Sequence, residues 1–204
     1  MLGFPVSTEP KHKTPVAKAK IITQFKLTGI KRAWFDETVS SVSITNQVNL
    51  QSMPSLRQGG DIKDIIVFHI VVKTKEYGML SALFAEHIKA KVILVVQYQQ
   101  SFQCAIFQRM LIFSPWVDES QLPEIPLSGL TLDVIWASAV TAVGGFEVPP
   151  EMLIDDFIEY TDSNNKILAE ITKLEKKMNA EVQSKRKFEL YQQIINLKKK
   201  ITKL

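Results

Sequence analysis

The chain has 204 residues, of which 46% are hydrophobic and 23% charged, enough apolar material for the core of one domain plus an appendage. Its single cysteine, Cys104, excludes an internal disulfide framework and indicates a reducing compartment. The longest apolar run, Ile65 to Val72, is only eight residues, and the first residues lack the pattern of a secretory signal. We therefore expect a soluble, cytoplasmic protein that makes no membrane contact.

The net charge of +4 is unevenly distributed along the chain. Residues 1–32 carry seven bases and one acid, residues 33–165 seven bases and sixteen acids, and residues 166–204 eleven bases and four acids. Two basic ends therefore flank an acidic middle. Such a pattern bears on partners rather than on the fold, although lysines that merely solvate helix faces would give the same composition.

The first part of the chain alternates between strand and helix patterns. Residues 1–20, with Pro and Lys recurring, indicate a loosely ordered basic lead-in. Alternating apolar residues predict strands at 21–27 and 41–48, with a short helix at 30–39 between them. Residues 64–73 are apolar on both faces, which predicts a central strand covered on both sides.

The following segments complete a domain over residues 21–148. The patterns predict a helix at 76–88, a strand at 91–98, a further strand at 102–108 that is joined or extended by 110–113, and an apolar helix at 127–143 ended by Gly144 and Gly145. The strand at 91–98 and the one that follows it are so close in the chain that they must form an antiparallel hairpin or nearly so. The predicted fold class is therefore α+β, with a mixed, mainly antiparallel sheet of about five strands and flanking helices.

Residues 149–204 have the pattern of a helical arm. Large residues recur in alternating steps of four and three, the spacing of a heptad seam. These residues form two rows along the arm, and Asn164 occupies the one position of the first row that lacks a large residue. The first row consists of Leu153, Phe157, Tyr160, Ile167, Ile171, Leu174 and Met178, and the second of Leu190, Ile194, Leu197, Ile201 and Leu204.

The two rows are out of phase. Continuing the first row from Met178 leads mainly to polar residues. The apolar exceptions are Phe188 and Ile195. Such a slip marks either a turn between two helices or the local unwinding of one long coiled coil. The polar residues 179–187, with Ser184 available as an N-cap, favour an antiparallel hairpin that turns near 180–185. The alternative is one long helix that pairs with another chain. A homodimer, in which the other chain is a second copy, is one case of this alternative.

Six basic residues of the arm gather in two short runs. Lys185, Arg186 and Lys187 would lie at the tip of a hairpin, and Lys198, Lys199 and Lys200 on its returning helix. A basic tip suits contact with the phosphates of DNA or RNA, because binding releases counterions. A solvated coiled-coil surface has much the same composition, so both interpretations stay open.

The sequence contains no evident catalytic, cofactor or metal site. A nuclease of the restriction-endonuclease type needs an acidic residue two positions before a strand-ending lysine. Asp61 and Asp64 lie upstream of Lys73, but the required position is Val71. His69 fits a hydrogen-bonded core histidine, and Cys104 a small core residue. We expect no enzymatic activity, no cofactor and no metal, with a divergent metal-dependent nuclease as the remaining catalytic alternative.

Several stretches resemble the bacterial family labelled domain of unknown function 4391. They are Arg186 to Leu190 with Ile194 to Lys199, Ser128 to Trp136 in the position of the family's GL-x-LD-x-(V/I)-W element, and Gln103 to Phe107 with Trp116 downstream. The resemblance covers nearly the whole chain and carries over no catalytic residue. It implies a prokaryotic protein commonly encoded beside DNA methyltransferases and helicase or restriction-type ATPases, as in anti-phage systems. In that element, Asp133 and Trp136 would cap and pack a helix.

These observations lead to one main functional hypothesis. We expect a non-catalytic accessory subunit of a prokaryotic DNA-processing assembly, of the restriction-modification or antiviral defence type. It would dock through its coiled-coil arm onto a protein partner, a helicase/ATPase or a DNA methyltransferase subunit. Nucleic-acid binding by the basic arm and N-terminus is the alternative.

Overall fold

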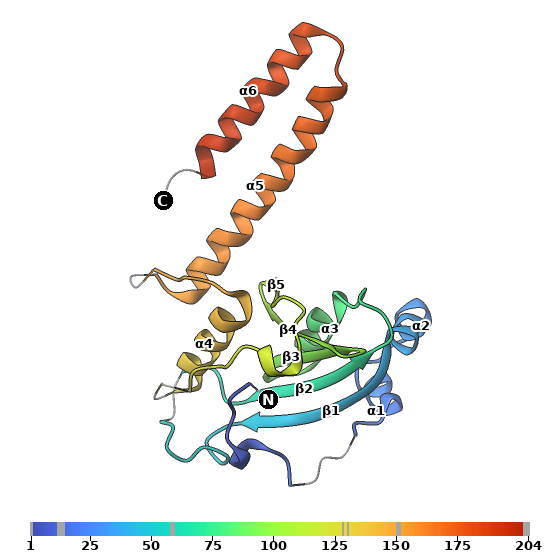
Figure 1. The fold of residues 1–204 in the computed structure, drawn as a ribbon, viewed down its shortest axis with the longest axis vertical. Coiled ribbons are helices and arrows are strands. Elements are labelled where there is room, and N and C mark those ends of the chain that lie inside the picture. The colour runs from blue at the N-terminus through green and yellow to red at the C-terminus, as the bar shows by residue number, and fades with distance from the viewer. Residues whose placement is uncertain are drawn as a thin grey trace. The chain divides into compact units, whose positions relative to one another are not determined.

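The computed structural model describes residues 2–11, 15–57, 60–127, 129, 131–149 and 152–201. The chain divides into two compact units, Met1–Pro149 and Pro150–Leu204 (Figure 1). The first unit is built from strands and helices and the second from two helices. The predicted fold class, an α+β domain followed by a C-terminal helical hairpin, is confirmed.

The described part of the first unit contains a five-stranded sheet whose strands lie side by side in chain order. The strands are β1 (Val39–Val48), β2 (Ile65–Val72), β3 (Lys91–Tyr98), β4 (Ser101–Gln108) and β5 (Met110–Phe113). β2 and β3 pair in parallel and are joined through α3 (Met79–His87), while the neighbouring pairs on either side are antiparallel. β2 is a central strand, as its doubly apolar sequence predicted.

One face of the sheet forms a core with three helices. These are α1 (Lys18–Gln24), α2 (Gly29–Thr38) and α3. Because side chains alternate along a strand, Phe68 of β2 and Leu94 of β3 point to the same side, where they join the buried cluster with Phe35 of α2 and Phe84 of α3. The rings of Phe68 and Phe84 meet edge-on with centroids 5.0 Å apart.

The other face is covered by the N-terminal segment and by α4 (Leu132–Gly144), which packs against β4 and β5. Leu2 and Phe4 are buried, and Asn46 of β1 donates a 2.8 Å hydrogen bond to Thr8 in the short helix η1 (Val6–Thr8). Pro15 forms a β-bridge with Ser43. Leu2 and Phe4 of the lead-in therefore contribute to the core of the first unit, whereas Val6 is 79% exposed. Residues 12–14 lie outside the described residues.

Two predicted elements differ most from the structure. The strand expected at 21–27 is wrong, since residues 18–24 form α1. Ile21 and Phe25 are four residues apart, which places both on one side of a helix, and both are buried. This tertiary burial outweighs the β-branched composition. The helix expected at 127–143 begins only at Leu132, because Thr131 occupies its N-cap position, with Oγ1 accepting from the Val134 N–H at 3.5 Å.

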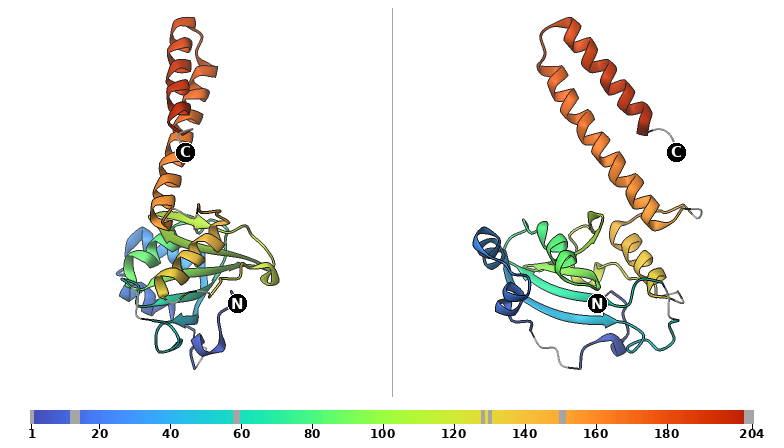
Figure 2. Two further views of the ribbon diagram at one scale, coloured as in Figure 1. Left: turned by 90° about the vertical axis from the view of Figure 1, so that its left-hand side faces the viewer. Right: turned by 180° about the vertical axis from the view of Figure 1, so that it is seen from behind.

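The second unit consists of α5 (Ile154–Ala180) and α6 (Ser184–Ile201), which pack against each other as an antiparallel pair (Figure 2). The chain turns between them at residues 181–183. The Tyr160 hydroxyl donates to the Ile201 carbonyl oxygen at 3.3 Å, which joins the early part of α5 to the end of α6. The polar interval of the sequence thus coincides with the break between two helices.

Two residues of α2 provide a test of the core on the helical face of the sheet. We expect Phe35→Ala, which removes a fully buried ring, to lower the free energy of unfolding by about 3–5 kcal/mol. Ile30→Ala on the same helix is the matched control, because Ile30 is 89% exposed and surface changes usually stay within ~0.5 kcal/mol. Urea denaturation of the full chain measures both, and equal losses would contradict the assigned orientation of α2.

Candidate interaction surface of the helical hairpin

The seam expected from the sequence lies largely between the two helices of the hairpin. Ile171 of α5 and Ile194 of α6 are buried. Leu153 stands before α5, is 73% exposed and does not belong to the packed seam, because the helix begins only at Ile154. Leu204 lies outside the described residues. The remaining seam residues are half-buried: Phe157, Tyr160, Ile167, Leu174, Met178, Leu190, Leu197 and Ile201.

The turn of the hairpin is organised by Glu181. Its carboxylate accepts hydrogen bonds from the backbone N–H groups of Val182 and Gln183, both at 2.9 Å. The bonds from Gln183 and Val182 lower the pKa of this carboxyl, with a further contribution from the charge of Arg186. Ser184, considered as an N-cap, is instead the first residue of α6. The side chain that binds the amides ahead of α6 is therefore Glu181.

Helical geometry divides the hairpin into two broad faces. Successive side chains are about 100° apart around a helix, so Leu168 and Glu175 project to one side of the α5 seam and Lys177 to the other. In α6, Tyr191 and Lys198 project to one side and Arg186 to the other. The ion pair between Lys198 and Glu175, at 3.1 Å, shows which sides of the two helices share a face.

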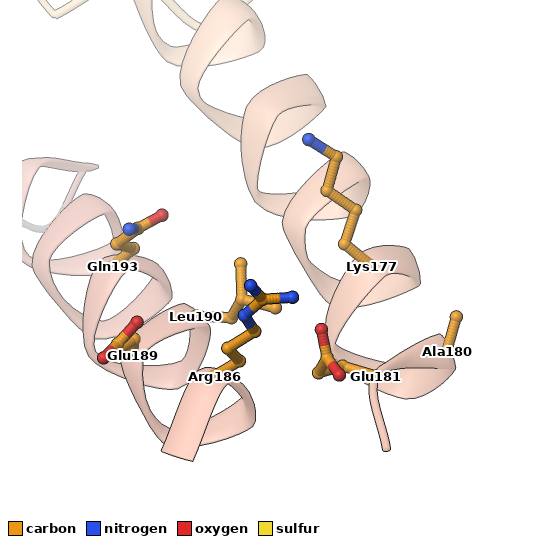
Figure 3. Close-up of a pocket in the computed structure, with 7 residues that line it drawn as sticks. All are labelled: Lys177, Ala180, Glu181, Arg186, Glu189, Leu190 and Gln193. Carbon is orange, nitrogen blue, oxygen red and sulfur yellow. The ribbon is translucent and has the colours of Figure 1, made fainter. Parts of the chain in front are cut away.

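One of these faces is polar. A groove of about 480 Å³ near the turn is lined by Lys177, Ala180, Glu181, Arg186, Glu189, Leu190 and Gln193. Figure 3 shows the Arg186 guanidinium directed from α6 toward the Glu181 carboxylate, with Leu190 beside it. Most of the lining is charged or amide-bearing, and charges of both signs are present. This polar face is therefore suited to solvent or to a polar contact.

The other face carries exposed apolar side chains, and we call it the apolar face. It consists of Phe188, which is 62% exposed, Tyr191 and Leu168, each 49% exposed, and the half-buried Ile195. Since aromatic side chains each present roughly 150–250 Å², the exposed apolar area is on the order of 300 Å². A typical monomer has no larger apolar patch than about 300–600 Å², and such patches are often functional.

The six basic residues selected from the sequence do not form one patch. All six are exposed on α6, but consecutive residues of a helix point in different directions. Arg186 and Lys200 lie on the side of the polar face, Lys187 and Lys198 between the seam and the apolar face, and Lys185 and Lys199 beyond its outer edge. Within each pair the residues are separated by roughly 16–21 Å along the helix. Lys185, Lys187, Lys198 and Lys199 therefore border the apolar face, and the six bases do not concentrate at the tip.

The residues of the apolar face do not belong to the heptad seam expected from the sequence. A signal for them is nevertheless present in the sequence. Phe188 and Ile195 continue the phase of the first row beyond Met178, and Tyr191 follows Phe188 by three residues. Because α6 already buries one row against α5, this second row remains exposed.

The residues considered for nuclease chemistry are not brought together. Asp64 immediately precedes β2 and accepts a 2.9 Å hydrogen bond from Asn49, whereas Lys73 follows the other end of β2 and donates to the Asp36 carbonyl oxygen at 2.9 Å. They lie at opposite ends of an eight-residue strand, roughly 30 Å apart along it. Among the described residues, no group of three or more His, Cys, Asp or Glu side chains could hold a metal ion.

The remaining polar residues singled out from the sequence have structural contacts. His69 is half-buried with Nε2 2.9 Å from Gln97 Oε1, and burial lowers its pKa. Burial raises the pKa of the Cys104 thiol to about 12. Trp136 is buried and donates to Gln108 at 3.1 Å, while Asp133 accepts from the Gly60 N–H at 2.9 Å. Asp133 therefore ties a loop to the first turn of α4, whose N-cap is Thr131.

Fold and surface together define an α+β domain followed by a helical hairpin with one polar and one apolar face. The chain belongs to the family described as "Domain of unknown function (DUF4391)", whose model matches residues 2–201. The family resemblance carried by the sequence is thus confirmed. No curated protein and no solved structure matches the chain. Across the described ranges, no helix is both long and apolar enough to cross a membrane.

The hydrogen bonds of Glu181 predict a pH dependence of the hairpin. Because folding lowers the pKa of this carboxyl, its contribution to stability is present above the unfolded pKa and is lost as the pH falls through the lower folded pKa. When the pH falls from ~6 to ~3, we expect the helices of Glu181→Gln to lose less stability than those of the wild type. Thermal unfolding followed by circular dichroism at each pH measures this.

Glu189→Gln is the matched control, because it removes a carboxylate from the same groove and leaves the Glu181 turn intact. The wild type and the control should lose more stability on acidification than Glu181→Gln. An identical pH dependence for all three proteins would contradict the role assigned to Glu181.

Proposed function

We propose that this protein is a non-catalytic accessory subunit that docks onto a larger assembly through the apolar face of its helical hairpin. The observation that carries the proposal is the exposure of Phe188, Tyr191 and Leu168 on one face of a hairpin whose seam is already packed. Tyr is among the residues enriched at the energetic centres of protein interfaces. A face of this composition is stabilised when a partner covers it.

The size of the apolar face sets what the partner must supply. Burial of about 300 Å² at about 25 cal/mol per Å² contributes roughly 7 kcal/mol. The entropic cost of association is of the same order. The face can therefore nucleate binding but does not account for tight binding alone, and the partner must add polar contacts around it.

The shape and charge of the face indicate the form of these contacts. An amphipathic helix laid along α5 and α6 would bury its own apolar row against Tyr191 and Ile195. Lys187 and Lys185, on opposite edges of the row, favour acidic residues on that helix. In line with the family resemblance, the proposed partner is a helicase/ATPase or DNA methyltransferase subunit of a prokaryotic defence or restriction-modification assembly.

Substitution of the apolar face tests the docking role. We expect the double variant Phe188→Ser with Tyr191→Ser to lose co-purification with such subunits by at least ~10-fold, because two aromatic contacts are removed. The experiment uses the tagged full-length chain, produced together with the candidate DNA methyltransferase and helicase/ATPase subunits. Partner recovery relative to the tagged chain is measured by quantitative mass spectrometry.

A matched double variant, Glu189→Ser with Gln193→Ser, alters the polar face of the same helix. It should retain wild-type recovery of the partner, and circular dichroism should show the same helix content for both double variants. Full retention of the partner by the Phe188/Tyr191 variant would refute docking through the apolar face.

Nucleic-acid binding by α6 is a second candidate function. Between Ser184 and Ile201 the helix carries six bases and one acid, a net charge of +5, and the bases are exposed. If these lysines contact phosphates, affinity falls steeply with salt, and loss of each contact reduces the salt slope by roughly 1.

Fluorescence anisotropy with single- and double-stranded DNA and RNA tests this candidate. We expect Lys185→Gln with Lys187→Gln to weaken binding at low salt and to reduce the salt slope by up to about 2. Lys89→Gln serves as control, because it removes one positive charge from an exposed loop of the first unit instead of from α6. Absence of binding to every strand type at low salt would exclude the candidate.

A further inference from the structure

An aromatic cluster lies where the parallel strands β2 and β3 end. Tyr98 is the last residue of β3, and Lys75 and Tyr77 belong to the connection that follows β2. Phe113 ends β5, and Trp116 follows it by three residues. The carboxyl ends of parallel strands are where open α/β sheets bind their ligands. This cluster is independent of the apolar face of the hairpin.

Tyr98 and Trp116 form two walls of a corner. Their ring centroids are 6.4 Å apart and their planes meet at 71°. Both side chains are half-buried. The Lys75 ammonium occupies this corner, with Nζ 5.1 Å from the Trp116 centroid and 5.7 Å from the Tyr98 centroid. We call the two rings the aromatic corner.

The aromatic corner is held by contacts behind it. Tyr77 is buried and meets the Trp116 ring edge-on at 5.9 Å, and its hydroxyl donates to Gln103. The residue after Trp116, Val117, exchanges backbone hydrogen bonds of 2.7 and 2.9 Å with Phe102 of β4. The walls are therefore fixed by the sheet, whereas Lys75 reaches the corner from an exposed loop position on a flexible side chain.

From this geometry we infer that the aromatic corner is a binding site for a quaternary ammonium group, with Lys75 as its internal occupant. The faces of aromatic rings attract cations, and two rings at a steep angle present two such faces to one charge. A primary ammonium keeps strongly bound water, so it fills such a corner less favourably than a methylated ammonium, whose methyl groups contact the rings directly. Lys75 marks the site and competes for it.

Lys75 competes with an external cation for the aromatic corner. A cation–π contact at an exposed position changes an equilibrium about 2- to 5-fold. Removal of the lysine should therefore strengthen binding of an external quaternary ammonium group by a similar factor. Removal of the Tyr98 ring should weaken it, because one wall of the corner is lost.

The experiment uses the full-length protein with ¹⁵N-labelled tryptophan. The chain contains three tryptophans, and the indole signal of Trp116 is assigned with Trp116→Phe. Tetramethylammonium chloride is titrated into wild type, Lys75→Ala, Lys75→Gln and Tyr98→Leu, with sodium chloride at equal ionic strength as reference. We expect a saturable shift of the Trp116 signal, with affinity about 2- to 5-fold higher in both Lys75 variants than in wild type.

Lys91→Ala is the matched control, because the Lys91 ammonium lies 5.2 Å from the centroid of a different ring, Trp136. It should leave the response of Trp116 unchanged. The inference would be overturned if, in both folded Lys75 variants, the Trp116 signal shifts without saturating. It would equally be overturned if sodium chloride produces the same shift in both. Choline and a trimethyllysine peptide then distinguish the two sources of the group: binding of choline identifies a small molecule, and binding of the peptide alone identifies a modified protein.

Discussion

Burial of the apolar seam between α5 and α6 is the constraint on which the candidate surface depends. Ile171 and Ile194 are buried in it, and this orientation determines which residues of each helix face outward. Once one row of α6 is committed to the seam, Phe188 and Tyr191 must project elsewhere, because a helix cannot turn two rows toward the same neighbour. The exposure of the apolar face is thus a direct consequence of the packing that forms the hairpin.

The turn makes this arrangement possible within a single chain. Only residues 181–183 separate the helices, and two amides of this short link are bound by the Glu181 carboxylate. A continuous helix would have kept Phe188 and Ile195 in phase with Met178, in one long seam. Breaking the helix instead lets the second row of Leu and Ile pack in cis and leaves Phe188, in the phase of the first row, exposed.

In the first unit, the parallel pairing of β2 and β3 has a comparable effect. It requires a crossover through α3, and the connection into that helix brings Lys75 and Tyr77 beside the end of β3. The return of the chain through β4 and β5 then places Trp116 against Tyr77 and Tyr98. Residues from three separate segments meet in the aromatic corner, and none of them contributes to the hairpin.

Periodicity in the sequence determined the α+β class, the central position of β2, the helical arm and most of its seam, because these features follow from local alternation and heptad spacing. It did not determine that residues 18–24 are helical, since burial of Ile21 and Phe25 outweighed their strand-like composition. Only the tertiary structure decided which row of α6 is exposed, how the six bases spread around it, and that Lys75 meets Tyr98 and Trp116. These depend on contacts between residues distant in the chain, which local patterns do not encode.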